Sequence, residues 1–482
     1  MTDEQPNDLM ATGVPGLDVV LRGGLPARSL YFVGGAPGTG KTTLGLQFLM
    51  EGRRRGERTL FVSLSQDRTD LERVAASHGF DLDGIPIEEV SAISLAPELG
   101  DRQTVLDTSD SELLEAGSKL EALISDSKAE RVVIDSLFEM RLLAHDSLSY
   151  RRELLQLRDA VSRLGATALA LDYTDETIGD RQLEGMVNGT LKLEAENPDY
   201  GATMRQLHVG KMRGHAFVEG NHSLTIRHGG LSVFPRVVPR QAEDVLTDDQ
   251  VTCGIDGLDE MMGGGLLLGT ICLIAGHSGT GKSTLCTAYA TAAVRDDRNA
   301  AMFLFEERPA IFRRRSENLG FRLEEQEAAG KLVLRHFDSA EMSPGEFIQT
   351  VVDTVEEKKI EVIVIDSLSG FLRAHPNGAD LIAQLHTLLT YLSRRNVLTI
   401  LTLTQHGLLE GENHAGIDVG CFADSALLLR NEEAGEDLRR TITVLKKRQG
   451  DHEQRVRRLL IGDRSVDVVP SSKSDRLHLA VV

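Results

Sequence analysis

Short apolar runs alternate with longer amphipathic stretches along the whole chain, and this pattern predicts strands separated by helices. Nearly continuous apolar strands that alternate with helices are typical of a parallel sheet covered on both faces. We therefore expect an α/β fold in which ligands bind at the carboxyl ends of the strands. The clearest strand-like runs are Thr59–Leu64, Arg131–Ile134 and Thr167–Asp172 in the first half, and Ala301–Phe305, Glu361–Ile365 and Leu398–Thr404 in the second.

The second half of the chain repeats landmarks of the first half in the same order. The Ile-Asp-Ser that contains Asp135 recurs around Asp366, and Lys211-Met212-Arg213 is echoed by Lys446-Lys447-Arg448 after a similar interval. The interval from Asp135 to Asp366 is far longer than a solenoid repeat of about 20–50 residues, so it indicates a domain duplication. We therefore predict a first domain at 1–234, a polar linker with two prolines at 235–247, a second domain at 248–463 and a loosely ordered tail at 464–482.

Each half also contains a phosphate-binding loop of the pattern G-x-x-x-x-G-K-[ST]. Both loops follow an apolar run, Leu30–Val33 or Ile271–Ala275, and open an apolar-periodic helix, which is the context that the motif requires. The glycines let backbone N–H groups surround a triphosphate, and the lysine reaches its terminal phosphates. The residues predicted to bind ATP are Gly35, Ala36, Pro37, Gly38, Thr39, Gly40, Lys41, Thr42 and Thr43 in the first loop, and Gly276, His277, Ser278, Gly279, Thr280, Gly281, Lys282, Ser283 and Thr284 in the second.

Two aspartates complete the predicted phosphate sites. Asp135 and Asp366 each end an apolar strand and precede a serine, which is the Walker B arrangement of a carboxylate near the phosphate loop. We expect these carboxylates to hold Mg²⁺ through water, together with the Thr42 and Ser283 hydroxyls. The alternative is that each aspartate is only a turn or cap residue.

The two halves differ after the second strand. Glu306-Glu307 follow Phe303-Leu304-Phe305, whereas Ser65-Gln66 stand at the matching place in the first half. A carboxylate here can polarise the attacking water, or a hydroxyl, for in-line attack on the γ-phosphate. Serine and glutamine cannot serve as bases at neutral pH, although glutamine can position a water. The alternative for the two glutamates is a first-turn pair for the helix predicted near Pro309–Leu319.

Taken together, these motifs resemble the KaiC family of tandem-domain, RecA-like ATPases over roughly residues 10–463. The resemblance implies two mainly parallel RecA-like sheets flanked by helices, and a homohexamer of two stacked rings with ATP bound between subunits. It also implies a regulatory protein partner, whose identity the sequence does not provide. The residues implied to reach a neighbouring subunit's ATP are Lys211 and Arg213 in the first domain, and Lys446, Arg448 and His452 in the second.

The chain departs from this family at two places. The family's first domain carries a glutamate pair where this chain has Ser65-Gln66, so we expect hydrolysis mainly in the second domain. The family's adjacent Ser-Thr phosphoacceptors are replaced by Gly420-Cys421, on the N-terminal side of Asp424, with Ser425 beyond it. Three alternatives stay open: a Ser/Thr autokinase with another acceptor, a scaffold that ATP merely assembles, and a RecA/RadA-type DNA-repair ATPase.

Composition narrows the choice of partners and compartment. The formal net charge is −20, which disfavours non-specific nucleic-acid binding, and the arginine runs at 53–55 and 313–315 are expected on solvated helix surfaces. The four cysteines form no CxxC pair, which argues against a zinc site or a disulfide framework. The acidic N-terminus does not resemble a signal peptide, and no apolar run reaches the roughly 20 residues of a membrane helix. We therefore expect a cytoplasmic protein with no membrane partner.

Overall fold

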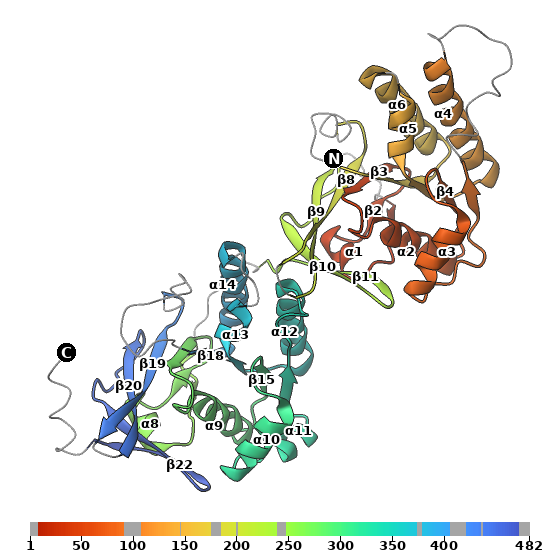
Figure 1. Ribbon diagram of the computed structural model, residues 1–482. Coiled ribbons are helices and arrows are strands. Elements are labelled where there is room, and N and C mark those ends of the chain that lie inside the picture. Colours follow the sequence, from red (N-terminus) through yellow and green to blue (C-terminus); the bar gives the residue numbers. More distant parts are fainter. Residues whose placement is uncertain are drawn as a thin grey trace. The chain divides into compact units, whose positions relative to one another are not determined.

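The computed structural model describes residues 8–90, 108–144, 146–174, 185–198, 201–238, 247–373, 378–404, 421–434 and 437–471. The chain divides into two compact units, Met1–Arg236 and Val237–Val482, each with a sheet and helices of its own (Figure 1). Strand β22 extends the second unit's sheet through Pro470, so the expected tail at 464–482 begins too early.

In the first unit, the described residues form one nine-stranded sheet in the order β11-β10-β9-β8-β3-β7-β6-β4-β5. The strands from β8 to β5 run parallel to their neighbours, and β9, β10 and β11 continue the sheet in antiparallel fashion. The strands are β3 (Leu30–Gly35), β4 (Thr59–Ser63), β5 (Ile87–Glu89), β6 (Arg131–Asp135), β7 (Thr167–Asp172), β8 (Gly189–Glu196), β9 (Met204–Met212), β10 (Asn221–Arg227) and β11 (Gly230–Phe234), with β1 (Leu9–Met10) and β2 (Leu25–Pro26) paired separately.

Helices cover both faces of this sheet, as the apolar pattern predicts. One face is packed by buried side chains of α1, α2 and α3, and the opposite face by those of α4, α5 and α6. This burial on both sides explains why β3, β6 and β7 consist almost entirely of apolar residues. The helices are α1 (Leu17–Val20), α2 (Lys41–Arg54), α3 (Arg68–Ser77), α4 (Thr108–Ser127), α5 (Leu137–Leu143) and α6 (Ser147–Arg163).

The second unit repeats the same strand order, β16-β15-β17-β18-β14-β19-β20-β21-β22, within its described residues. The strands are β14 (Ile271–Gly276), β15 (Ala300–Leu304), β16 (Leu332–His336), β17 (Val362–Asp366), β18 (Leu398–Thr404), β19 (Ser425–Ala434), β20 (Asp437–Lys447), β21 (Arg457–Gly462) and β22 (Ser465–Pro470), with β12 (Gln250–Val251) and β13 (Leu266–Leu267) paired separately. Both units therefore have a mixed, mainly parallel sheet, which confirms the predicted fold class.

Two layers of helices enclose the second sheet. One face is packed by α8, α9, α10 and α11, and the other by α12, α13 and α14. The helices are α8 (Asp256–Met261), α9 (Lys282–Arg295), α10 (Pro309–Asn318), α11 (Leu323–Ala328), α12 (Pro344–Lys358), α13 (Leu368–Arg373) and α14 (Gly378–Arg394). In both units the loop between the first parallel strand and its helix lies at the carboxyl edge of the sheet, where α/β folds bind ligands.

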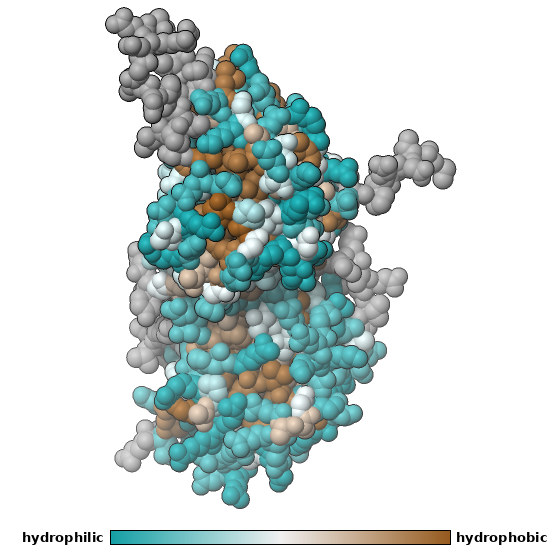
Figure 2. All heavy atoms as spheres, turned by 90° about the vertical axis from the view of Figure 1, so that its right-hand side faces the viewer, coloured by the Kyte–Doolittle hydropathy of each residue, from teal (hydrophilic) through white to brown (hydrophobic). Residues whose placement is uncertain are grey.

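The surface and the cysteines are those of an ordinary globular protein. The face in Figure 2 is mostly hydrophilic, with separate hydrophobic areas between the charged side chains. All four cysteines are free thiols, of which Cys253, Cys272 and Cys286 are buried and Cys421 is exposed. No helix in the described part of the chain combines the length and the apolar character that a membrane span requires.

Candidate functional site

The two phosphate loops connect a buried strand to the first turn of a helix, as the motif predicts. Gly40 and Gly281 cap α2 and α9 with φ angles of 103° and 106°, a conformation that favours glycine. A Cβ at Gly40 would lie 2.5 Å from Ile226 Cδ1, and a Cβ at Gly281 would lie 2.8 Å from Ile461 Cδ1. Glycine therefore permits the tight turn that directs the first backbone N–H groups of each helix toward an anion.

The loop lysines have the same arrangement in both units. Lys41 Nζ donates hydrogen bonds to the carbonyls of Gly35 at 2.7 Å and Ala36 at 2.9 Å. Lys282 Nζ donates to the carbonyls of Gly276 and His277, both at 2.8 Å. Each ammonium is thus held inside its own loop, at the place where the terminal phosphates of a nucleotide are bound in this motif.

Charged neighbours distinguish the two lysines. Burial lowers the pKa of the Lys41 ammonium, and the carboxylates of Asp135 and Asp172 oppose that shift. Burial also lowers the pKa of the Lys282 ammonium, where Asp366 and Glu306 are the main opposing carboxylates. The Walker B aspartate therefore acts on the loop lysine in both units. The second carboxylate differs, because it is Asp172 in the first unit and Glu306 in the second.

The Walker B aspartates lie beside the hydroxyl of the loop, as predicted. Thr42 Oγ1 donates to Asp135 Oδ2 at 2.7 Å, and Asp366 accepts hydrogen bonds from Ser283 and from Thr402 Oγ1, the latter at 2.6 Å. Burial raises the pKa of both carboxyl groups, and these hydrogen bonds oppose the shift. A hydroxyl and a carboxylate side by side fit Mg²⁺, which is usually bound through few protein oxygens together with waters and phosphates.

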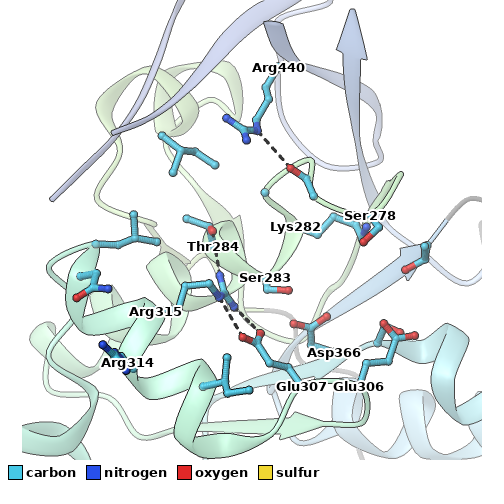
Figure 3. A pocket seen from close by; sticks show the side chains of 18 of the residues that line it. Ser278, Lys282, Ser283, Thr284, Glu306, Glu307, Arg314, Arg315, Asp366 and Arg440 are labelled. Carbon is cyan, nitrogen blue, oxygen red and sulfur yellow. Dashed lines mark hydrogen bonds and ion pairs between the residues drawn. The ribbon is translucent and has the colours of Figure 1, made fainter. Parts of the chain in front are cut away.

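In the second unit, a cavity of about 930 Å³ opens over the phosphate loop (Figure 3). The predicted residues that line it are Ser278, Gly279, Gly281, Lys282, Ser283, Thr284, Glu306, Glu307 and Asp366. The geometry therefore places the two glutamates in the same cavity as the predicted phosphate and magnesium ligands. Asn318, Leu319 and Ile461 supply a part of the wall that is not predicted from the sequence.

The two glutamates have different surroundings. Glu307 forms a two-point ion pair with Arg315, in which Nη2 lies 2.8 Å from Oε2 and Nε lies 3.3 Å from Oε1. Glu306 lies close enough to Lys282 for its charge to oppose the lowering of the lysine's pKa. Glu306 is therefore the glutamate whose charge acts on the phosphate-binding lysine, whereas Glu307 is engaged by a guanidinium.

In the first unit, Ser65 and Gln66 stand after β4 at the two positions that match Glu306 and Glu307. Ser63 Oγ donates to the Gln66 carbonyl at 2.6 Å and accepts from the Gln66 N–H at 3.1 Å, which fixes the turn after the strand. The Gln66 side-chain oxygen is buried without a hydrogen-bond partner among the described residues. The matching positions thus provide an amide and a hydroxyl in place of two carboxylates.

Two arginines contact the phosphate loops although neither is predicted from the sequence. Arg205 Nε donates to the Gly38 carbonyl at 3.4 Å, and Arg440 Nε donates to the Gly279 carbonyl at 3.2 Å. The internal repeat is the signal that could have revealed them, because each arginine precedes its Lys-x-Arg landmark by the same spacing.

The arginine run at 313–315 also differs from its prediction as solvated surface. Arg314 and Arg315 line the cavity, and Arg313 forms an ion pair with Glu327 at 2.7 Å. This side of α10 (Pro309–Asn318) lines the cavity over the phosphate loop, and periodicity alone does not reveal that direction.

In the second unit, the residues expected to reach a neighbouring subunit do not line the cavity over the phosphate loop. Lys446 Nζ donates to the Ala423 carbonyl at 2.7 Å, Arg448 Nη1 lies 3.2 Å from Asp424 Oδ1, and Arg213 Nη2 donates to the Gly185 carbonyl at 2.6 Å. Lys211 lies on β9, and His452 is half-buried after β20. Their roles toward a second chain stay predictions.

Comparison with known proteins places this geometry in a family. Residues 10–238 and 251–473 match the family described as "ATPase: KaiC", once in each unit. The chain is 27% identical over 479 residues to "Circadian clock protein KaiC3" of Synechocystis, covering 97% of this chain and 93% of that protein. It is 27% identical over 473 residues to "Circadian clock oscillator protein KaiC" of Synechococcus elongatus, covering 96% and 90%. Because the family match spans both phosphate loops and nearly the whole chain, the protein belongs to the KaiC family of ATPases.

Proposed function

We propose that this protein is a nucleotide-assembled, hexameric ATPase with a signalling or timing role, and that ATP hydrolysis takes place mainly in the second domain. The observation that carries the proposal is the pair Glu306 and Glu307 in the cavity over the second phosphate loop, against Ser65 and Gln66 at the matching place in the first unit. Both domains are proposed to bind ATP, because both have the loop, the lysine and the Walker B aspartate.

In the proposed mechanism, Lys282 and the N–H groups at the start of α9 bind the β- and γ-phosphates. Ser283 and Asp366 would hold Mg²⁺, which neutralises charge on the phosphates when it is bound. Glu306, which lines the cavity and whose charge acts on Lys282, polarises the attacking water. The γ-phosphoryl group then passes to water in line with the departing ADP oxygen, and the proton of the water moves to the Glu306 carboxylate.

Water is favoured over a protein hydroxyl as the acceptor. The family's phosphoacceptor positions correspond to Gly420, which lies outside the described residues, and to Cys421, which has a thiol. Ser425, the serine or threonine nearest to Cys421 along the chain, is buried at the start of β19. This arrangement supports an ATPase over a Ser/Thr autokinase with an acceptor in this segment.

The proposed hexamer is supported by the resemblance and by the surface of β20. Leu438 and Leu445 on this strand are 66% and 59% exposed, and Leu445 is followed directly by Lys446. Exposed apolar side chains beside a cation suit a contact in which one subunit reaches the nucleotide of the next. ATP bound at such an interface would favour assembly by mass action.

The proposal is tested by measuring phosphate release from the full-length protein. We expect Glu306→Gln to lower kcat by about 10²–10⁴-fold, the usual loss for a general base, while ATP still binds. Glu324→Gln, a change of an exposed glutamate on α11, is the matched control and should leave turnover unchanged. If Glu306→Gln combined with Glu307→Gln keeps wild-type turnover, the first domain is the site of hydrolysis and the assignment fails.

A further inference from the structure

The three consecutive arginines of α10 have three different environments. Arg313 forms its ion pair with Glu327, outside the cavity lining. Arg314 and Arg315 both line the cavity, but only Arg315 is joined to Glu307. Figure 3 shows the Arg315 guanidinium between Glu307 and Thr284, with the Arg314 side chain farther from Glu307. Of these three arginines, Arg315 is therefore the one whose guanidinium contacts the phosphate-loop helix and Glu307.

Arg315 contacts the first turn of the phosphate-binding helix. Its Nη1 lies 3.3 Å from Thr284 Oγ1, and Thr284 follows Ser283, the predicted magnesium ligand. The guanidinium is also close enough to Asp366 to lower the pKa of that carboxyl group, against the larger effect of burial. The guanidinium is therefore within the same electrostatic environment as the predicted phosphate and magnesium ligands.

The carboxylate that holds Arg315 is a chemical counterpart of a phosphate. Both present two anionic oxygen acceptors that the guanidinium fork can bind at two points. Nε and Nη2 of Arg315 face Glu307, and Nη1 faces the helix that binds the phosphates. Glu307 and a bound nucleotide would therefore compete for one cation.

We infer that Arg315 is a phosphate ligand of the second site, contributed by the same chain, and that Glu307 holds it in position until a nucleotide binds. The inference rests on the proposed nucleotide-binding function of this site and adds a cation to its lysine. When the phosphates arrive, Arg315 exchanges one anionic partner for another, so the guanidinium is paired both before and after the nucleotide binds.

In the described residues of the first unit, a histidine contacts the first-turn hydroxyl in place of an arginine. At the equivalent place the first-turn hydroxyl, Thr43 Oγ1, lies 3.3 Å from His78 Nε2. A second ring nitrogen, Nδ1 of His78, lies 3.3 Å from the Arg227 carbonyl. A histidine between a hydroxyl and a carbonyl supplies no permanent cation to the first phosphate site, so the proposed role of Arg315 is specific to the second.

The test is Mg-ADP binding to the full-length protein, measured with N-methylanthraniloyl-ADP and by its displacement with ADP or adenosine. The second site is the component of binding that Lys282→Ala abolishes. We expect Arg315→Ala to weaken ADP binding at this site by about 10- to 100-fold, the loss of charge-assisted hydrogen bonds, and to leave adenosine displacement unchanged. Arg313→Ala, at the arginine of α10 that lies outside the cavity lining, is the matched control and should retain ADP affinity close to that of the wild type.

The variant Glu307→Gln distinguishes between an Arg315 that binds phosphate and an Arg315 that only neutralises Glu307. If Arg315 binds phosphate, Glu307→Gln alone tightens ADP binding, and Glu307→Gln with Arg315→Ala stays as weak as Arg315→Ala. If Arg315 only neutralises Glu307, the double variant recovers wild-type affinity, and the inference is overturned. Equal losses in Arg313→Ala and Arg315→Ala would overturn it as well. If ADP binding to the wild type has no component that depends on Lys282, both the proposed function and this inference fail. If that component is present and Arg315→Ala leaves it intact, only the inference fails.

Discussion

Replacing Thr402 by valine should destabilise the second domain through one lost hydrogen bond. The Thr402 hydroxyl is fully buried on β18 and donates to Asp366 at 2.6 Å. Valine has nearly the same shape as threonine, so the change leaves no cavity and removes only the donor. A hydrogen bond to a charged group contributes about 1.5–3 kcal/mol, and its loss leaves a buried carboxylate with one donor fewer.

This free energy converts into a measurable temperature. For a domain of this size, 1 kcal/mol shifts Tm by about 2–4 °C, so Thr402→Val should lower the Tm of the second-domain transition by roughly 3–12 °C. The same strand provides a control in Thr399, whose buried hydroxyl has no hydrogen-bond partner among the described residues. Thr399→Val removes an unsatisfied polar group and should leave Tm unchanged or raise it.

The pH dependence follows from the charge of Asp366. Burial raises the pKa of this carboxyl group, and the hydrogen bond from Thr402 opposes the shift, so Thr402 stabilises the ionised form. The loss in Thr402→Val should therefore be full at a pH above the folded-state pKa of Asp366 and should shrink as the pH falls through it. The assay is calorimetric unfolding without nucleotide or Mg²⁺ over a pH series. Equal shifts for Thr402→Val and Thr399→Val, or a Thr402→Val loss that does not change with pH, would refute the reasoning.

Two further predictions concern assembly and modification. Lys41→Ala should impair hexamer formation more than Lys282→Ala if the first ring is structural, and static light scattering with saturating Mg-ATP measures this; a wild type that stays monomeric contradicts the proposed hexamer. After long incubation with Mg-ATP, intact-mass spectrometry should find no stoichiometric phosphate, and one phosphate per chain within residues 410–430 would contradict the preference for water.

The parallel core of each domain is predictable because its signals are local. A buried parallel strand needs apolar residues on both faces, and the predicted Thr167–Asp172 and Leu398–Thr404 match β7 and β18 as observed. The phosphate loops are predictable because one short segment contains the glycines, the lysine and the hydroxyl together. Sequence therefore suffices where the chemistry lies within a few consecutive residues.

The antiparallel half of each sheet is harder to predict. Strand β20, Asp437–Lys447, combines charged and exposed apolar residues, and a half-exposed strand gives a weaker signal than a buried one. The tail shows the same difficulty, because 464–482 contains polar residues typical of a disordered end. Nevertheless Val466 and Val468 alternate there, and β22 pairs Val468 with Leu459 of β21. The alternation is the signal that a composition-based prediction overlooks.

Contacts between side chains of distant segments are predicted neither by the apolar pattern of the strands nor by a short motif. Thr402 and Asp366 meet because β18 and β17 are neighbours in the sheet, and Arg315 meets Glu307 because α10 turns back over the strand end. The register of β17 against β18 decides which threonine of β18 faces the aspartate. These contacts contribute to the electrostatics of the site, although Thr402 and Arg315 belong to no motif.

The positions of the carboxylates provide a physical basis for dividing the work between the domains. In the first unit, the second carboxylate that acts on the loop lysine is Asp172, which is fully buried at the end of β7 and ion-paired with Arg141 of α5. A carboxylate that is buried and paired with a guanidinium is a poor base for water, because its charge is already compensated. In the second unit, the corresponding charge is on Glu306, in the cavity above the phosphate loop. The proposed hydrolysis in the second domain therefore relies on a carboxylate that lines the cavity, whereas the second carboxylate of the first domain is the buried Asp172.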